Sequence, residues 1–283
     1  MQKIKDIVKL IRVKHWIKNI LVFVTMFLST NVTLSNLYKL TIGFFAFSLI
    51  SSVVYIINDI VDKDKDAKHS KKKERPIASG RISIGFAIIL AITLFIAAVL
   101  LNYLIDGLNI KLYIILIGYL LLNLAYSLKL KNLVLIDVFC IVLGFIARLF
   151  YGSVISGIEV SKFLYLTVMF ASFFLGFGKR RNELINIKDS ARPMLKCYNK
   201  NFLDKNMYVA LALTVVFYSI WAISQEGILY LISIPVLTLI FFKYSLIVEG
   251  DSFGDPVDVI SSDKALLGYI LVYAITIICA LFI

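Results

Sequence analysis

Long runs of apolar residues, separated by short charged stretches, dominate the pattern of this chain. An α-helix needs about 20 apolar residues to cross roughly 30 Å of hydrocarbon. The first run is the least regular, because Lys18 and Asn19 lie near its start. We expect an all-α, polytopic membrane protein with a single integral-membrane domain over residues 1–283. The nine helices predicted from the runs lie at about 16–34, 38–57, 82–105, 110–128, 133–156, 161–178, 207–224, 228–248 and 265–283.

The distribution of basic residues predicts how these helices are oriented. Four stretches, 1–18, 63–81, 129–131 and 179–205, hold 24 of the 30 Lys and Arg residues. Such residues accumulate on the cytoplasmic side of membrane spans. We therefore expect a multi-pass protein of the cell membrane, with the N-terminus and active site on the cytoplasmic side and the C-terminus outside. This topology, together with anionic lipid headgroups, explains the net charge of +12, so no nucleic acid is expected as a partner.

An acidic motif, NDIVDKDKD over residues 58–66, follows the second apolar run. On a helix, Asn58, Asp62 and Asp66 recur at every fourth position and lie on one face, with Asp59 beside them. Such oxygen ligands suit Mg²⁺, which completes its shell with water and substrate phosphates. The alternative is a solvated loop neutralised by its own lysines, but acids at a membrane edge are costly and usually functional. We predict a metal site of all four residues, with Asp62 and Asp66 as catalytic residues.

Several cations on the same predicted side are candidates for binding phosphate. Lys18 lies inside an apolar run, where either phosphate contact or snorkelling to the interface explains it. Arg75 and Arg81 share a loop with the acidic motif and could bind phosphate oxygens that the metal leaves free. The intervening Pro76 and Gly80 favour a turn that brings this loop back over the site.

A further group of polar residues is predicted to form a basic wall. Asp137 and Arg148 lie eleven residues apart in one apolar run, hence on one helix face. Each either forms a structural salt bridge or lines a polar cavity in the bundle. Arginine has a planar fork that matches phosphate. The other substrate-binding candidates of this group are Tyr126, Lys129, Lys131, Lys179, Arg180 and Glu183.

The cysteines and histidines offer no metal-binding pattern. Cys140, Cys197 and Cys279 lack the spacing of metal ligands and are interpreted as buried thiols. His15 and His69 are far apart in the sequence, although His69 lies in the charged loop and could contact a phosphate.

Together these motifs resemble a known family. NDxxDxxxD followed by RPIASG is similar to the first aspartate-rich motif of the UbiA superfamily of intramembrane prenyltransferases, and the likeness covers nearly the whole chain. It implies a nine-helix bundle around a central cavity. Most members carry a second aspartate-rich motif after the sixth helix, whereas this chain has GKRRNEL there, with Asp189 nearby. The set HWIKN, YSLKLKN, GKRRNEL and GDPVDVISSDK is similar to the branch that transfers phosphoribosyl groups to decaprenyl phosphate.

The resemblance implies a Mg²⁺-dependent enzyme that joins ribose C1 of phosphoribosyl pyrophosphate to the phosphate of a polyprenyl phosphate. Pyrophosphate leaves, and the lipid-linked pentose serves cell-envelope glycan assembly. A basic second motif fits this reaction because a 5-phosphate and a lipid phosphate both require cations. The alternatives are a prenyltransferase that moves a prenyl group from a polyprenyl diphosphate to an aromatic or other ring acceptor and, less favoured, a transporter. The isoprenoid length, the downstream glycan and the oligomeric state stay open.

Overall fold

The computed structural model is built from helices joined by short loops, and no β-strand occurs in the part of the chain that it describes. His69 and Asp189 lie outside that part. An all-α fold, as the apolar runs predict, is confirmed. The described residues are 2–29, 32–68, 72–186, 193–250 and 255–282.

The chain forms two compact units, which are described separately, and the single domain over residues 1–283 stays a prediction. Unit 1 comprises Met1–Val24, Thr33–Lys131 and Ala147–Gly157. Its elements are α1 (Gln2–Ile11), η1 (Val13–Phe23), α3 (Leu34–Val61), α4 (Lys63–Lys68), η2 (Lys72–Glu74), α5 (Ile84–Asp106), α6 (Ile110–Leu128), most of η3 (Leu130–Asn132) and the second half of α7 (Ile136–Ser156).

Unit 2 comprises Thr25–Val32, Asn132–Ile146 and Ile158–Ile283. Helix α7 therefore belongs to both units, since its first half lies in unit 2. The other elements of unit 2 are most of α2 (Val24–Phe27), α8 (Lys162–Asn186), η4 (Pro193–Cys197), α9 (Lys200–Ile223), α10 (Ile228–Glu249), α11 (Pro256–Ser262) and α12 (Lys264–Phe282).

Eight of the described helices, namely α3, α5–α10 and α12, are long and apolar enough to cross a membrane. This supports a multi-pass membrane protein but does not show the predicted count of nine. The predicted first span, 16–34, differs most, because it contains 3₁₀ helix η1 and the short α2 instead of one long helix. Its polar groups explain why: the Trp16 indole donates to Ser52 at 3.0 Å, and the Asn19 amide donates to Ser48 at 2.8 Å.

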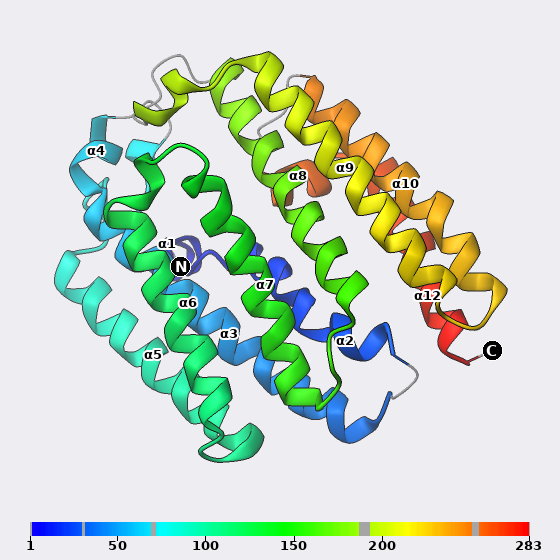
Figure 1. The fold of residues 1–283 in the computed structure, drawn as a ribbon. Coiled ribbons are helices and arrows are strands. Elements are labelled where there is room, and N and C mark those ends of the chain that lie inside the picture. Colours follow the sequence, from blue (N-terminus) through cyan, green and yellow to red (C-terminus); the bar gives the residue numbers. More distant parts are fainter. Residues whose placement is uncertain (1, 30–31, 69–71, 187–192, 251–254, 283) are drawn as a thin grey trace. The chain divides into compact units, whose positions relative to one another are not determined.

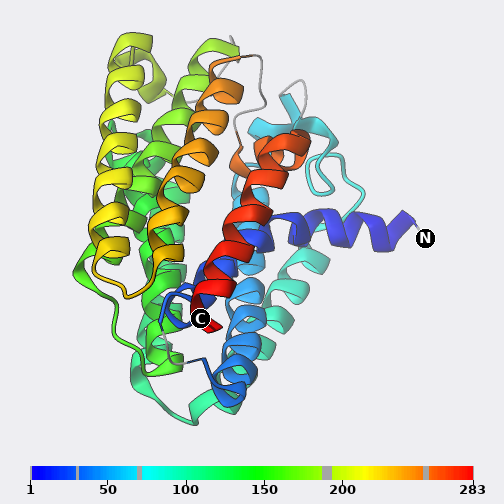
Figure 2. The same ribbon diagram turned by 90° about the vertical axis from the view of Figure 1, so that its right-hand side faces the viewer.

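Within unit 1, α3 packs beside α5 and α6, and α1 runs across the direction of α3 (Figures 1 and 2). A buried apolar cluster joins α1, α3, the loop after the acidic motif and α5. Ile77 and Ile82 place that loop in the cluster, where both are nearly inaccessible. The cluster therefore fixes the backbone that carries Arg75 next to the end of α3. Its buried members are Leu10, Val53, Ile56, Ile77, Ile82, Ala87 and Ala91.

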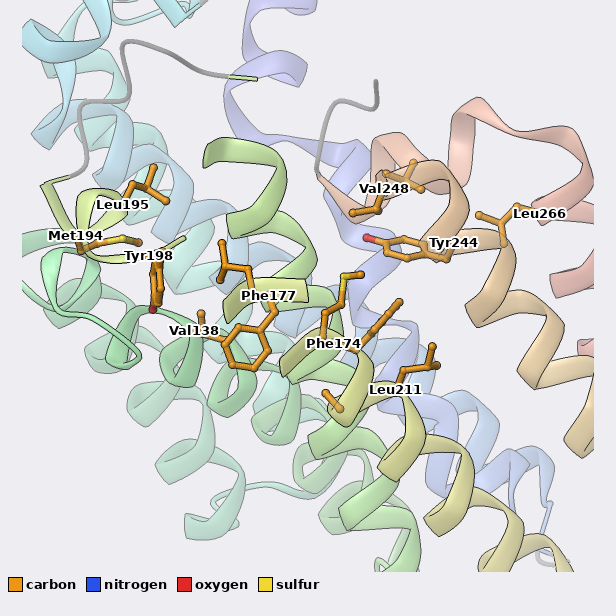
Figure 3. Close-up of a cluster of buried hydrophobic side chains, with 14 residues drawn as sticks. Val138, Phe174, Phe177, Met194, Leu195, Tyr198, Leu211, Tyr244, Val248 and Leu266 are labelled. Atoms are coloured by element: carbon orange, nitrogen blue, oxygen red, sulfur yellow. The ribbon is translucent and has the colours of Figure 1, made fainter. Parts of the chain in front are cut away.

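Within unit 2, α8, α9 and α10 lie side by side around a second apolar core (Figure 1). Figure 3 shows Phe174 and Phe177 of α8 at the centre of this core, with Val138 of α7 beside Phe177. Gly176 allows the close approach of α7 to α8, because a Cβ there would come within 2.7 Å of the Val138 side chain. This packing places the start of α7 next to the polar end of α8.

The cysteines do not all match their interpretation. Cys140 is buried, but Cys197 and Cys279 are exposed. The interpretation of all three as buried thiols is therefore wrong for two of them. Cys197 is the last residue of η4, and Cys279 lies on an exposed position of α12.

Candidate functional site

The acidic motif spans the end of α3 and the short helix α4. Asn58 and Asp59 lie in the last turn of α3, Asp62 follows its end, and Asp66 lies in α4. Helix α3 ends before Asp62, yet the Asp62 N–H donates to the Asn58 carbonyl at 2.9 Å and the Asp66 N–H to the Asp62 carbonyl at 2.8 Å. The helical spacing that the sequence predicts is thus kept through the motif.

Arg75 bridges two of the four motif residues. Its Nη1 donates to Asp66 Oδ2 at 2.5 Å and to Asp59 Oδ1 at 3.1 Å. Both carboxylates are nearly buried, with 3% exposure for Asp59 and 4% for Asp66. Because they share one cationic nitrogen, their oxygens lie close enough to share a cation. The structure therefore brings Arg75 to the acidic motif, as expected from their common loop.

Arg12 is a second cation at this cluster, and sequence reasoning missed its role. Its Nη2 donates to Asp59 Oδ1 at 2.6 Å, and its guanidinium lies 4.7 Å from the centre of the Tyr55 ring. Its backbone is left-handed, with φ of 53°, which is uncommon for a residue with a Cβ. Such conformations persist where the surrounding contacts require them. Arg12 stands in a basic stretch that membrane topology alone explains, so no pattern distinguished it.

The end of α6 supplies further partners to the acidic motif. Lys131 donates to both carboxylate oxygens of Asp62 at 2.8 Å. The Ser127 hydroxyl, in the last turn of α6, donates to the Asn58 side-chain oxygen. Lys131 was predicted to stand in a basic wall, but in this structure it belongs to the acidic cluster. Of its neighbours in the sequence, Lys129 is exposed and Tyr126 is half-buried.

The donor chemistry of this cluster fits Mg²⁺, because its ligand atoms are carboxylate and amide oxygens. The cluster is arranged around protein cations, with Arg75 on Asp59 and Asp66 and Lys131 on Asp62. Among the described residues, no group of three or more His, Cys, Asp or Glu side chains is placed to hold a metal ion. Asp59 and Asp66 are the pair that already converges on one cationic centre. The assignment of all four residues as ligands stays a prediction.

Three other predicted residues of unit 1 lie apart from these carboxylate contacts. Arg81 donates to Asp6 at 3.0 Å and to the Glu74 carbonyl at 2.6 Å, so it joins α1 to the loop. Arg148 donates to the Asn19 side-chain oxygen at 2.7 Å and to the Tyr119 hydroxyl at 3.0 Å. Its guanidinium also lies 4.9 Å from the centres of the Phe47 and Tyr119 rings, a cation–π arrangement. Lys18 is half-buried in η1.

In unit 2, Arg180 is enclosed by a buried polar network. It pairs with Asp137 and with Glu183, the latter at 2.6 Å, and both Arg180 and Asp137 are fully buried. Arg180 thus resembles a structural ion pair, the alternative that the sequence left open for Asp137. Its charge is balanced by two carboxylates of the protein.

Tyr198, which sequence reasoning missed, completes this network. Its hydroxyl donates to Asp137 at 2.9 Å and accepts the Leu135 N–H at 2.7 Å. Leu135 has a left-handed backbone, with φ of 66°, so the tyrosine stabilises a turn that leads into α7. Burial raises the pKa of Tyr198 to about 12, which keeps the phenol neutral beside Asp137. A lone tyrosine in a loop carries no signal in the sequence that would reveal this role.

The other two cations of the GKRRNEL motif also pair with carboxylates. Lys179 lies 3.4 Å from Asp255, which caps the start of α11. Arg181 is paired with Asp204 at 2.5 Å and donates to the Val248 carbonyl at 3.0 Å. The Lys179 side chain remains 30% exposed, whereas that of Arg181 is 4% exposed. Lys179 is therefore the most accessible cation of the motif.

The comparisons with known proteins agree with this fold. A decaprenyl-phosphate phosphoribosyltransferase of Corynebacterium glutamicum is 30% identical over 98% of this chain and 86% of its own length. One of Mycolicibacterium smegmatis is 27% identical over 93% of this chain and 88% of its own length. A solved UbiA homolog of Archaeoglobus fulgidus, bound to GPP and Mg²⁺, aligns with a TM-score of 0.73 and 19% identity over 96% of each chain. The model of the UbiA prenyltransferase family matches residues 19–257. The chain therefore belongs to the UbiA prenyltransferase family.

Proposed function

We propose that this enzyme transfers the 5-phosphoribosyl group of phosphoribosyl pyrophosphate to a polyprenyl phosphate, decaprenyl or similar, and releases pyrophosphate. The observation that carries the proposal is the likeness, over nearly the full length, to proteins named decaprenyl-phosphate phosphoribosyltransferase. The basic GKRRNEL motif, where most of the family is expected to have aspartates, supports the same choice. The product, a lipid-linked pentose phosphate, would serve glycan assembly in the cell envelope.

We further propose that Mg²⁺ binds at the acidic cluster of unit 1. Asp59 and Asp66 would hold it, with Asp62 and Asn58 as further direct or indirect ligands. When bound, the metal neutralises negative charge on the leaving pyrophosphate, which is the main contribution expected of it. A solved neighbour of the same fold contains Mg²⁺, which supports the use of a divalent metal.

Protein cations around the cluster would contribute to the same reaction. Arg75 would donate hydrogen bonds to the pyrophosphate, placed where negative charge develops as the bond from C1 breaks. Arg12 would balance the charge of Asp59. The C1–oxygen bond to pyrophosphate breaks while a new bond forms between C1 and an oxygen of the lipid phosphate. The nucleophile is already an anion, so the reaction requires no general base.

The cations of unit 2 divide into accessible and enclosed groups. Lys179 is the best candidate to bind a phosphate group, because its side chain is partly exposed and its contact with Asp255 is long. Arg180 has no exposed surface and two carboxylate partners. We therefore assign Arg180 to structure and Lys179 to substrate. This proposal keeps the expectation of phosphate binding for Lys179 and departs from it for Arg180.

A prenyltransferase reaction is the second candidate, because it is the reaction for which the family is named. One assay separates the two. Membranes that contain the protein are given labelled phosphoribosyl pyrophosphate with polyprenyl phosphate, and in parallel polyprenyl diphosphate with labelled 4-hydroxybenzoate. We expect labelled lipid only in the first reaction. Product in the second reaction alone would overturn the proposal.

We also propose that the protein lies in the cell membrane with its N-terminus and the acidic cluster on the cytoplasmic side. The basic loops support this orientation. Single cysteines at Ser79 and Glu226, on a background without other cysteines, test it with a membrane-impermeant thiol reagent. Ser79→Cys should react only from the cytoplasmic face and Glu226→Cys only from the other face. Labelling of each cysteine from the opposite face would show that the protein has the inverse orientation in the membrane.

A further inference from the structure

Arg75 occupies a place that a divalent cation would also take. Its Nη1 contacts Asp59 and Asp66, which are the two carboxylates that converge on one centre. A metal bound at about 2.1 Å to both of these carboxylate oxygens would lie close to the position of Nη1 and would repel the guanidinium. The arginine and the metal therefore compete for the same oxygen atoms.

The loop that carries Arg75 is fixed, whereas its side chain has room to move. The Ser79 N–H donates to the Arg75 carbonyl and the Ile82 N–H to the Pro76 carbonyl, both at 2.9 Å. Ile77 and Ile82 anchor the loop in the apolar cluster of unit 1. The Arg75 side chain is 26% exposed, while the side chains of Asp59 and Asp66 are 3% and 6% exposed. A change of partner thus requires rotation of one long side chain and no movement of the loop.

Charge balance predicts the effect of such a change of partner. Without a metal, Arg12 and Arg75 neutralise Asp59 and Asp66 in a nearly buried cluster. A divalent cation added to this set leaves two surplus positive charges. Binding of an anion is then favoured, and a diphosphate can bind to both the metal and the released guanidinium.

We propose that Arg75 is an exchangeable counter-ion, which pairs with Asp59 and Asp66 in the metal-free protein and transfers to the diphosphate when a divalent cation binds. Metal and diphosphate then bind as a coupled pair, each strengthening the binding of the other. This inference rests on the proposed function, because it places the diphosphate at this cluster. It adds that Arg75 opposes the binding of metal when diphosphate is absent and supports the binding of metal when diphosphate is present.

The test measures binding to the full chain in detergent, without turnover. Mn²⁺ is the probe, followed by the loss of the free-ion EPR signal, first alone and then with inorganic pyrophosphate. Arg75→Gln removes the competing charge and keeps a polar, although shorter, side chain. Lys9→Gln is the matched control, since Lys9 contacts the Glu74 carbonyl beside Arg75 instead of a carboxylate of the motif. Arg75→Lys keeps the charge on a shorter side chain, and it lacks the planar fork that matches two phosphate oxygens.

Loss of the Arg75 charge is expected to change the two affinities, for Mn²⁺ alone and for pyrophosphate with Mn²⁺, in opposite directions. Arg75→Gln should bind Mn²⁺ alone about 10-fold more tightly than the wild type, and should bind pyrophosphate about 10-fold more weakly at saturating Mn²⁺. Both affinities of Arg75→Lys should fall between those of the wild type and those of Arg75→Gln. Both affinities of Lys9→Gln should match those of the wild type. Thermal unfolding checks the fold: Arg75→Gln should unfold at a lower temperature than the wild type, and Mn²⁺ should restore it.

Each other outcome is decisive. If Arg75→Gln leaves the affinity for Mn²⁺ unchanged or weakens it, the arginine does not compete with the metal and the inference is wrong. If Mn²⁺ binds more tightly but pyrophosphate is unaffected, Arg75 does not transfer to the diphosphate. If the wild type binds neither Mn²⁺ nor pyrophosphate in the presence of Mn²⁺, the proposed function itself fails.

Discussion

The acidic cluster of unit 1 and the basic motif of unit 2 both contain an arginine that bridges two carboxylates. Arg75 joins Asp59 to Asp66, and Arg180 joins Asp137 to Glu183. They differ in access to solvent, because the Arg75 side chain is 26% exposed and that of Arg180 is fully buried. A buried ion pair is costly to separate, whereas a partly exposed one exchanges partners more easily. The same local arrangement therefore fits an exchangeable contact in one unit and a permanent one in the other.

The largest effect is expected at the acidic cluster. Asp66→Asn should abolish phosphoribosyl transfer, because a neutral amide does not replace an anionic metal ligand. The variant should still insert in the membrane and elute as a single species in detergent, since the loop is held by apolar contacts. Asp62→Asn should behave likewise. Full activity of either variant in the presence of Mg²⁺ would remove the metal assignment.

In unit 2 the corresponding change should act on stability. Arg180→Ala leaves two carboxylates without their shared cation, and breaking a buried pair costs about 3–5 kcal/mol. We expect a strong fall in the unfolding temperature in detergent and little folded protein in membranes. If this variant is as stable as the wild type but uses phosphoribosyl pyrophosphate poorly, Arg180 binds substrate and the comparison fails.

Lys179 should show the effect on substrate use that Arg180 does not. Lys179→Ala removes a charge-assisted contact worth about 1.5–3 kcal/mol, which corresponds to roughly a 10- to 100-fold loss in kcat/KM for phosphoribosyl pyrophosphate. Its unfolding temperature should stay near that of the wild type. Ribosyl pyrophosphate without the 5-phosphate is the control substrate. A variant that keeps the wild-type preference between the two donors would show that the 5-phosphate is bound elsewhere.

The smallest effect is expected for Tyr198→Phe, which removes a hydroxyl and keeps the ring that stacks on Phe202. Loss of its hydrogen bonds should lower the free energy of unfolding by about 1–2 kcal/mol at neutral pH. The folded-state pKa of about 12 lies above the ordinary value near 10, so the neutral phenol is favoured in the folded state. The contribution of Tyr198 should therefore be complete below pH 10 and be lost as the pH rises through 12.

The measurement for Tyr198 is the difference in unfolding free energy between the wild type and Tyr198→Phe across that pH range. It should shrink from pH 10 to pH 12. Tyr269→Phe is the control in the same unit, because its exposed ring lies on α12, whereas the Arg180 network is built from α7, α8 and Tyr198. A constant difference for Tyr198→Phe would show that its hydroxyl is not held against Asp137.

The sequence predicted the elements that depend on local composition. Long apolar runs specify helices because each one satisfies its own backbone hydrogen bonds, and eight such helices are present in the described residues. The four-residue spacing of the acidic motif likewise predicted its helical register, which the backbone hydrogen bonds keep. The prediction of one long helix failed at 16–34, where polar side chains bond to serines of α3 and the described residues form 3₁₀ helix η1 and the short α2.

Only the tertiary structure decided which charges meet. Arg12 reaches Asp59 across 47 positions in the sequence, Lys131 reaches Asp62 across 69, and Arg180 reaches Asp137 across 43. The charge of each residue can be read from the sequence, but its partner depends on which helix ends are packed together, and that packing is set by apolar surfaces elsewhere in each unit. The sequence thus determined which ionisable groups the protein carries and on which helices, while the packing decided which of them are paired for structure and which remain accessible.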